Sequence, residues 1–330
     1  MASLVSKGAA DKGTANTTGA RHEDDNKVTT TPDKTVKEIP GKGRGLVARV
    51  DIATGTRILC EKPLLTVQPM APSEVERAVA AKLKLLPKTE QRQFLSLHNH
   101  YPGRYPLSGI GGVYATASLI NHSCVPNAHH SWNRGTGRET VHAIRDISAG
   151  DEITIAYDRG GPLLGFQCEC AGGCLFTSSS SSAAAALLLQ ASDSRRLRLR
   201  RLDDSTGDAG LMARNPGKSL RLCRALLRDL ADEFGPGNAL LARTCYDAFQ
   251  VCVAHGDLAR AAVFARRMYE ARVVCEGEDS PDTQRAAALA SDPAGHAIFK
   301  AFGSAWQTPR DAVRPPEQDE ARFNKWLFQE

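Results

Sequence analysis

The pattern of apolar and polar positions divides the chain into a strand-rich part and a helical part. Between residues 37 and 176 lie short apolar-rich runs such as 45–50, and in the run 150–157 apolar residues alternate with polar ones. This period of two is typical of half-buried strands. From about 217 to 330 the apolar residues recur three and four positions apart, as in 220–230, which predicts helices with one buried face. The fold class is therefore expected to be α+β.

Helical spacing also occurs inside the strand-rich part. Apolar residues on both sides of Pro87 recur at helical intervals, which predicts two short helices inserted at about residues 71–100. In the C-terminal part, residues 255–257 read His-Gly-Asp and should end one helix and begin the next. Small residues on the following helix, Ala262 and Ala265, would let antiparallel helices approach closely, as in tetratricopeptide-like pairs.

One short phrase occurs twice in the strand-rich part. Residues 51–55 read Asp-Ile-Ala-Thr-Gly, and residues 146–150 read Asp-Ile-Ser-Ala-Gly. Asp and Ser at the front and Gly near the end are typical of turns. The phrase therefore predicts strand–turn–strand in both places. A shared preference for turn residues explains the repetition, and a duplication is left open.

Composition marks two segments outside the predicted domains. Residues 1–36 are polar with few large apolar side chains, so they should bury too little surface to fold and are expected to be disordered. Residues 177–216 contain runs of serine and alanine and further polar stretches, and are interpreted as a low-complexity linker. The domains are thus placed at 37–176 and at 217–330.

Charge and cysteine content indicate the cellular compartment of the protein more than its function. The net charge of +5 on 330 residues would suit an acidic partner without predicting one. The first residues do not resemble a secretory signal, and no apolar run reaches the roughly 18 residues of a membrane span. We expect a protein that is neither secreted nor embedded in a membrane. Its nine cysteines should lie in a reducing compartment, where clustered thiols bind metal.

Four cysteines are grouped as in a metal site. Cys168, Cys170 and Cys174 lie within seven residues, and Cys124 lies upstream in a polar motif. Three thiols so close together need a common partner, and a fourth would complete the tetrahedral site of a structural zinc ion. Four other cysteines lie on the apolar stripes of the helical part and are predicted to be core residues: Cys223, Cys245, Cys252 and Cys275.

The order of four motifs resembles that in SET-domain protein lysine methyltransferases. They are Gly43-Arg44-Gly45-Leu46, Asn121-His122-Ser123-Cys124-x-Pro126-Asn127, Gly150-Asp151-Glu152-Ile153-x-x-x-Tyr157 and Cys168-x-Cys170-x-x-x-Cys174. The resemblance covers roughly residues 37–176, and the helical part is similar to that of SMYD-like proteins, particularly fungal members without the MYND finger. It implies a SET domain of short β-strands with a threaded pseudoknot and a zinc-binding post-SET tail, followed by an all-α TPR-like region.

The resemblance also implies a cofactor, S-adenosylmethionine, and its binding residues. The glycine loop would hold the methionine moiety of the cofactor, the Asn-His pair would bond its adenosine part, and an aromatic ring of the tail would pack on adenine. In the family the fourth zinc ligand comes from the Asn-His-Ser-Cys segment. The residues implied in cofactor binding are Lys42, Gly43, Arg44, Gly45, Asn121, His122, Tyr157 and Phe166.

Tyr157 is implied as the catalytic residue. By period-two alternation it lies on the same strand face as Ile153 and Ile155. In the family this tyrosine closes a narrow channel in which the lysine nitrogen meets the sulfonium methyl group. Methyl transfer is an in-line displacement, so most of the catalysis should come from positioning. The apolar channel and the nearby sulfonium disfavour the ammonium form of the lysine.

Alternatives to this function rest on particular stretches. The stretch from Tyr105 to Tyr114 is short, and the connection from Tyr157 to Phe166 is brief, with Leu164 where some relatives place a second channel aromatic. A catalytically degenerate scaffold that binds protein partners through its helices is therefore the alternative. Direct nucleic-acid binding through the arginines of 195–201 ranks last, because no stacking aromatics are interleaved.

The expected partner is a protein that presents a lysine, either a histone or a non-histone protein. A further protein partner on the C-terminal helices is compatible with this reading. The expected location is the nucleus, the cytoplasm or both.

Overall fold

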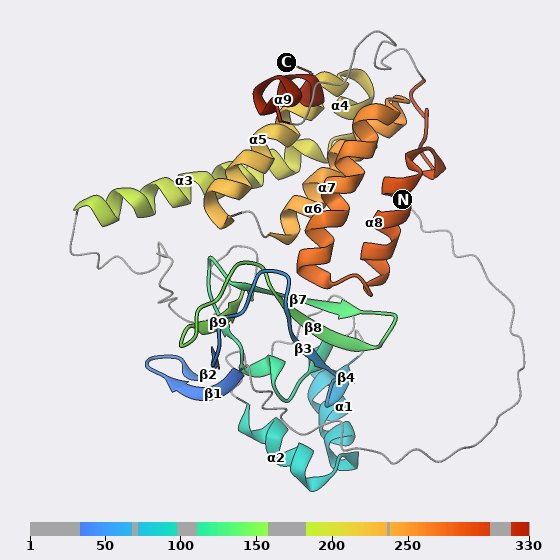
Figure 1. Ribbon diagram of the computed structural model, residues 1–330. Coiled ribbons are helices and arrows are strands. Elements are labelled where there is room, and N and C mark those ends of the chain that lie inside the picture. The colour runs from blue at the N-terminus through green and yellow to red at the C-terminus, as the bar shows by residue number, and fades with distance from the viewer. Residues whose placement is uncertain are drawn as a thin grey trace, which may run out of the picture.

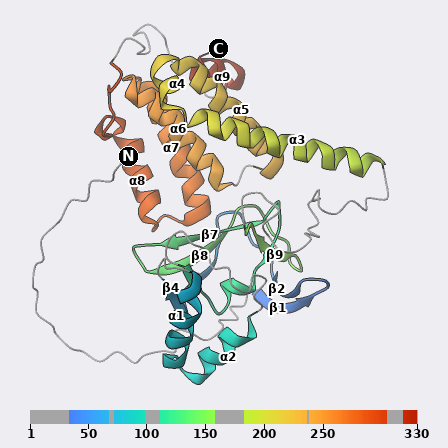
Figure 2. The same cartoon turned by 180° about the vertical axis from the view of Figure 1, so that it is seen from behind.

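The strands of the molecule lie between helices α1 (Pro72–Leu85) and α2 (Lys88–Ser96) on one side and the C-terminal helices on the other (Figure 1). Figure 2 shows the same arrangement from behind. In the part that the structure describes, no helix is long and apolar enough to cross a membrane. This computed structural model describes residues 34–67, 72–97, 111–157, 183–235, 238–303 and 318–329.

One sheet joins segments that are far apart in the chain. Its order is β1 (Lys34–Ile39), β2 (Gly43–Ala48), β9 (Glu152–Ile155) and β6 (Asn121–His122). Strands β1 and β2 form an antiparallel hairpin, and β2 pairs antiparallel with β9. Strand β6 pairs with β9 in parallel, with His122 opposite Ile155. A parallel pair needs a long connection, and the residues between β6 and β9 supply it.

That connection contains most of a second sheet. Its order is β3 (Arg57–Glu61), β8 (Arg138–Ala143) and β7 (Ala128–Asn133), all antiparallel. The short strands β4 (Leu65–Val67) and β5 (Gly111–Val113) pair with each other beside the inserted helices. The apolar core of the strand-rich part is shared by the first two sheets and includes the buried side chains of Leu46, Ile120, Val141, Ile147 and Ile153.

Helices α1 and α2 occupy the region where helical spacing predicts an insert. Pro87 is the N-cap of α2, and Val79 of α1 is buried against Leu65 of β4. Leu86 and Phe94 pack on the same small cluster. The insert therefore has an apolar centre of its own, separate from the shared core of the two larger sheets.

Strand β1 begins earlier than the sequence indicates. Its first residue, Lys34, is 3% exposed, and its ammonium donates a hydrogen bond to the carbonyl of Ile58 at 2.6 Å. The prediction of disorder for residues 1–36 is therefore wrong for 34–36, because a long-range contact compensates the polar composition. Residues 1–33 lie outside the described residues.

The two copies of the turn phrase pair with each other. Ile52 and Ile147 exchange backbone hydrogen bonds at 2.8 and 2.9 Å. The carboxylate of Asp146 accepts from the backbone N–H of Thr54, and that of Asp51 accepts from the backbone N–H of Ala149, both at 2.8 Å. Each turn thus satisfies backbone groups of the other, so the repetition has a structural role beyond turn formation.

The C-terminal part is a helical bundle in which consecutive helices pack together. These helices are α5 (Pro216–Phe234), α6 (Ala239–Ala254), α7 (Leu258–Glu276) and α8 (Pro281–Ser291). A short 3₁₀ turn, η3 (Pro293–Gly295), follows α8. As predicted, 255–257 ends one helix and begins the next, since the carboxylate of Asp257 caps α7.

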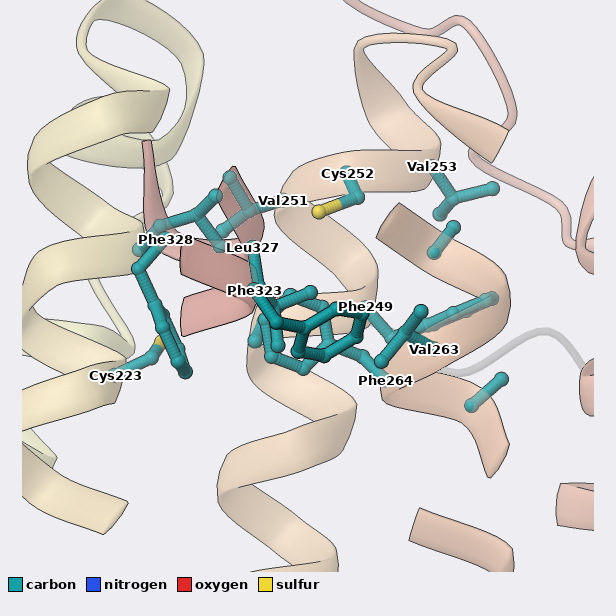
Figure 3. Packing of buried hydrophobic residues seen from close by; sticks show 14 residues of the cluster. Cys223, Phe249, Val251, Cys252, Val253, Val263, Phe264, Phe323, Leu327 and Phe328 are labelled. Atoms are coloured by element: carbon teal, nitrogen blue, oxygen red, sulfur yellow. The ribbon is translucent and has the colours of Figure 1, made fainter. Parts of the chain in front are cut away.

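Aromatic and small residues fill the centre of this bundle. The rings of Phe249 and Phe264 are fully buried, and the last helix, α9 (Glu320–Phe328), inserts Leu327 and Phe328 beside them (Figure 3). On α7, Ala261 is fully buried like Ala265, whereas Ala262 is partly exposed. The four cysteines predicted to be core residues are confirmed as buried: Cys223, Cys245, Cys252 and Cys275.

The interpretation of 177–216 as a linker is wrong from residue 183 onward. Helix α3 (Ala183–Thr206) and helix α4 (Ala209–Arg214) occupy most of it, and α3 extends beyond the bundle at its N-terminal end (Figure 1). Residues 177–182 lie outside the described residues. The alanine and leucine runs that look like low complexity are also strong helix formers.

Ion pairs to buried carboxylates of α5 hold α3 in place. Arg196 pairs with Glu233 at 2.6 Å, and Arg198 pairs with Asp229, while both carboxylates are at most 2% exposed. Leu199, next to Arg198 in the sequence, is buried against leucines of α5. Buried carboxylates need such partners, and composition alone could not identify partners more than thirty residues away along the chain.

A polar joint connects the helical bundle to the strands. Nε of Arg57 on β3 donates to Nε2 of His142 on β8 at 3.1 Å, and the same guanidinium forms an ion pair with Asp279 between α7 and α8. Gly277 has a φ of 82°, and a Cβ there would lie 2.7 Å from Nη2 of Arg57. Burial, followed by the charge of Arg57, lowers the pKa of His142 to about 4. His142 is therefore neutral at neutral pH.

Acid should loosen this joint. Because the folded pKa of His142 lies below its ordinary 6.5, the unfolded chain binds the proton more tightly, and stability falls as the pH drops from 6.5 toward 4. The contribution lost is on the order of 3 kcal/mol at most. A His142→Gln variant can still accept from Arg57 but cannot titrate, so it should lack this part of the pH dependence. Urea unfolding between pH 7 and 4 measures the free energy of unfolding of both proteins. An equal pH dependence of this free energy in the variant and the wild type would contradict the lowered pKa of His142.

Candidate functional site

A carboxylate at the start of β9 connects two of the residues implied in cofactor binding. Oε2 of Glu152 accepts from the ammonium of Lys42 at 2.7 Å, and Oε1 accepts from the side-chain amide of Asn121 at 2.8 Å. The side chains of Lys42 and Glu152 are 24% and 18% exposed. The pair is thus only partly screened by water, and it joins the loop before β2 to β9, while the bond from Asn121 joins β9 to β6.

Gly45 lets these groups approach each other. A Cβ at this position would lie 2.7 Å from the amide nitrogen of Asn121 and 3.0 Å from Oε1 of Glu152. Real side chains are not tolerated at such distances without displacement. Gly43, two residues earlier, has a φ of 72° and open space around it. Glycine is therefore required at the two positions for different reasons: at Gly45 because other groups approach closely, and at Gly43 because the backbone has a positive φ.

Asn127 secures β9 from the side of β6. Its amide nitrogen donates to the carbonyl of Glu152 at 2.8 Å, and its amide oxygen accepts from the backbone N–H of Thr154 at 2.8 Å. These two hydrogen bonds from one side chain replace backbone hydrogen bonds that a longer neighbouring strand would make to β9. In addition, the N–H of Ser123 donates to the carbonyl of Ile155 at 2.9 Å. The end of β9 is therefore fixed just before Tyr157.

Tyr157 is held by hydrogen bonds from both its hydroxyl and its backbone N–H. Its hydroxyl donates to the carbonyl of Ile120 at 2.6 Å, and its backbone N–H donates to Nδ1 of His122 at 3.1 Å. The side chain is 43% exposed. Burial of the phenol, followed by the negative charge of Glu152, raises the pKa of Tyr157 to about 12. The hydroxyl stays protonated at neutral pH, and with its proton directed at a carbonyl its oxygen can accept a hydrogen bond.

His122 connects the tyrosine to the predicted metal site. Since its Nδ1 accepts from a backbone N–H, the neutral ring carries its proton on Nε2, which lies 3.4 Å from Sγ of Cys124. The ring is 6% exposed. This tautomer directs the Nε2–H donor at the sulfur of Cys124.

A carboxylate on β3 positions the chain that leads into β6. Glu61 accepts from the backbone N–H groups of Thr116 and Ala117 at 2.9 Å, at the start of the 3₁₀ turn η1 (Ala117–Leu119). Burial raises the pKa of Glu61, and the bonds from these N–H groups counteract the rise. The turn ends at Ile120, the residue whose carbonyl receives the Tyr157 hydroxyl.

The predicted site residues fall into three groups. Lys42, Gly45, Asn121, His122 and Tyr157 lie together around the β2–β9–β6 junction, with Gly43 at the start of β2. The side chain of Arg44 instead reaches Ser96 at the end of α2. Within the described ranges there is no cluster of three or more His, Cys, Asp or Glu able to hold a metal ion. Phe166, Cys168, Cys170 and Cys174, as well as most of the stretches 105–114 and 158–165, lie outside the described residues.

Sequence reasoning missed the residues that organise the site. Glu152 and Asn127 lie inside the motifs that carry the family resemblance, which implies no role for them, and the sequence pattern gives Glu61 no role either. A signal for Glu152 existed: it is the one charged residue of a strand that otherwise contains Ile and Thr, and the lysine of a glycine loop needs an anionic partner when it is partly buried. No comparable signal marks Glu61, because its partners are backbone groups.

The chain is similar in sequence to proteins of one known family. The SET domain family matches residues 43–158. The histone-lysine N-methyltransferase set5 of Schizosaccharomyces pombe is 33% identical over 291 residues, which cover 80% of this chain and 85% of that protein. A SET and MYND domain-containing protein of Dictyostelium discoideum is 41% identical over 78 residues, 20% of this chain and 22% of that protein.

A solved structure that concerns the product specificity of histone lysine methyltransferases is 19% identical, covering 41% of this chain and 52% of that one. Its TM-score of 0.25 is too low to support any argument. The family assignment rests on the matched SET region and on the extent of the similarity to the yeast enzyme. On that basis, this chain belongs to the SET-domain protein-lysine methyltransferases.

Proposed function

We propose that this methyltransferase takes its methyl group from S-adenosylmethionine and transfers it to a lysine side chain of a histone. The observation that supports the proposal most directly is the oriented phenol of Tyr157 beside the Lys42–Glu152–Asn121 cluster. A non-histone protein would present the same lysine chemistry. The similarity to an enzyme named for histone lysine favours the histone, and with it an action in the nucleus.

The residues around the β2–β9–β6 junction have the chemistry that the cofactor requires. Bound there, S-adenosylmethionine would supply an activated methyl group. Lys42 carries a cation that suits its carboxylate, and the backbone at Gly43 is open for close approach. Asn121 and His122 would contact its adenosine part, with Phe166 from the tail on the adenine ring.

Tyr157 would orient the lysine of the substrate. Its pKa of about 12 keeps the phenol neutral, so it is suited to hydrogen bonding and unsuited to act as a general base near neutral pH. The phenol oxygen, with its own proton engaged by Ile120, accepts from the substrate amine and directs the amine lone pair. Catalysis then depends on alignment of the reacting atoms.

The tail is proposed to bind a structural zinc ion through Cys124, Cys168, Cys170 and Cys174. In support, Nε2 of His122 lies 3.4 Å from Sγ of Cys124 and could donate to the thiolate that a zinc ligand must be. A closed four-sulfur site would hold the tail, including Phe166, over the cofactor. The ion itself would take no part in the methyl transfer.

The helical part is proposed to be TPR-like and to offer a surface for a protein partner. Helices α5 to α8 pack in consecutive pairs, and fully buried alanines such as Ala248, Ala261 and Ala265 allow the close approach typical of such pairs. A scaffold without turnover would keep this surface and lose the chemistry. Cofactor binding distinguishes the two.

The wild-type full chain, purified with zinc, should bind S-adenosylmethionine in calorimetry and transfer radiolabelled methyl groups to histones. The site offers the charge and backbone access that the cofactor needs, which is why binding is expected. Label on another protein of a cell extract, with histones unlabelled, would overturn the histone substrate alone. Failure to bind the cofactor would overturn the proposal and favour the scaffold.

Tyr157→Phe should reduce the transfer rate about 100-fold or more, because the ring remains while the group that orients the amine is lost. Cofactor affinity should change little in comparison. Tyr246→Phe is the matched control: its hydroxyl lies 3.1 Å from His296 inside the helical bundle, so the rate should stay near that of the wild type. A wild-type rate for Tyr157→Phe would disprove the assigned role.

Native mass spectrometry should find one zinc ion per chain. Cys124→Ser should lose it, since three thiolates hold zinc far less tightly than a closed site. Cys60→Ser, which changes an exposed cysteine of β3, should retain the ion. A metal-free wild type, or full zinc content in Cys124→Ser, would contradict the site.

A further inference from the structure

Glu152 has no place among the contacts that the resemblance to the family implies. Yet it is the residue on which Lys42 and Asn121 converge, one on each carboxylate oxygen. Its backbone is already secured through the bond from Asn127 to its carbonyl and through pairing of β9 with β2. The carboxylate is therefore dispensable for holding the strand, and a role of its side chain has to be sought in what it does to its neighbours.

The charge of Glu152 acts in two directions. It balances the cation of Lys42 inside a half-buried site, where an unbalanced charge would be costly. It also acts toward the catalytic end of the site, because the short strand β9 runs from Glu152 to Ile155, two residues before Tyr157, and the same carboxylate contributes to the raised pKa of Tyr157. A positive charge near Tyr157 would be stabilised by the field that disfavours the phenolate there.

We propose that Glu152 is a positioning residue that orients Lys42 and Asn121 and, through its negative charge, makes the site prefer a cationic sulfonium to a neutral thioether. This inference rests on the proposed function, because it assumes that S-adenosylmethionine binds at this junction. The ligand before transfer carries the sulfonium charge, and the product, S-adenosylhomocysteine, does not. Glu152 would thus help the product leave.

A purely structural role predicts something different. If Glu152 only kept the loop before β2 in place, its loss would weaken both ligands by the same factor. If its charge acts on the sulfonium, the loss weakens S-adenosylmethionine more than S-adenosylhomocysteine. The dissociation constant of S-adenosylmethionine divided by that of S-adenosylhomocysteine therefore separates the two roles. This ratio is unaffected by partial misfolding that lowers the active fraction equally for both ligands.

The test measures both dissociation constants by calorimetry on the zinc-replete full chain. Glu152→Gln should weaken S-adenosylmethionine about tenfold and S-adenosylhomocysteine about threefold, as expected for one charge acting at a partly screened distance. Glu152→Asp should restore the wild-type ratio, because it keeps the charge. Asp151→Asn is the matched control: it removes the neighbouring exposed carboxylate, which is bonded within its own turn to Ser148, and should leave the ratio unchanged.

Lys42→Met should change the preference for S-adenosylmethionine over S-adenosylhomocysteine in the opposite direction from Glu152→Gln. Without its partner cation, the carboxylate of Glu152 is unbalanced, so the preference for the sulfonium should increase even if both ligands bind more weakly. This variant leaves the proposal testable if Glu152→Gln does not fold.

The outcomes are separable. Failure of the wild type to bind S-adenosylmethionine would disprove the proposed function. Normal binding by the wild type with an unchanged ratio in Glu152→Gln would overturn the role of Glu152 alone. A weaker preference for S-adenosylmethionine over S-adenosylhomocysteine in Lys42→Met than in the wild type would overturn it as well.

Discussion

The parallel pairing of β6 with β9 is the interaction on which the site depends. Asn121 lies opposite Thr154, and His122 lies opposite Ile155, so a two-residue strand from one part of the chain reaches the groups of another. Pairs this short are marginal by themselves. The bonds from Asn127 to β9 and the carboxylate of Glu61 beneath the preceding turn compensate for the missing ladder. Without them the phenol, the amide and the glycine loop would not meet.

Sequence reasoning succeeded where the information is local. The helix start at Asp257, the inserted helices around Pro87 and the turn phrases all depend on neighbouring residues, and the structure contains each of them. The grouping of Asn121 with Tyr157 was available only through the family resemblance, because nothing in the spacing of the two residues requires a parallel pair. Periodicity predicts which face of a helix or strand is buried, but it does not predict which other element that face packs against.

The failures have a common cause in long-range polar contacts. Helix α3 looked like a linker because its stability depends on carboxylates of α5, and β1 seemed to start later because the buried ammonium of Lys34 has its acceptor on β3. Glu152 and the Arg57–His142–Asp279 joint belong to the same class. A charged residue reads as solvated surface in a sequence, whereas in this molecule several charged residues are internal connectors between elements.

The paired turns at 51–55 and 146–150 have a consequence for how this protein can change. Exposed turns usually tolerate insertions and drift independently. Here each turn completes the backbone bonding of the other through Asp51 and Asp146, so a length change in one leaves its counterpart unsatisfied. Evolution should therefore alter the two loops in step, and an epitope tag or a grafted peptide would be better accommodated elsewhere on the surface.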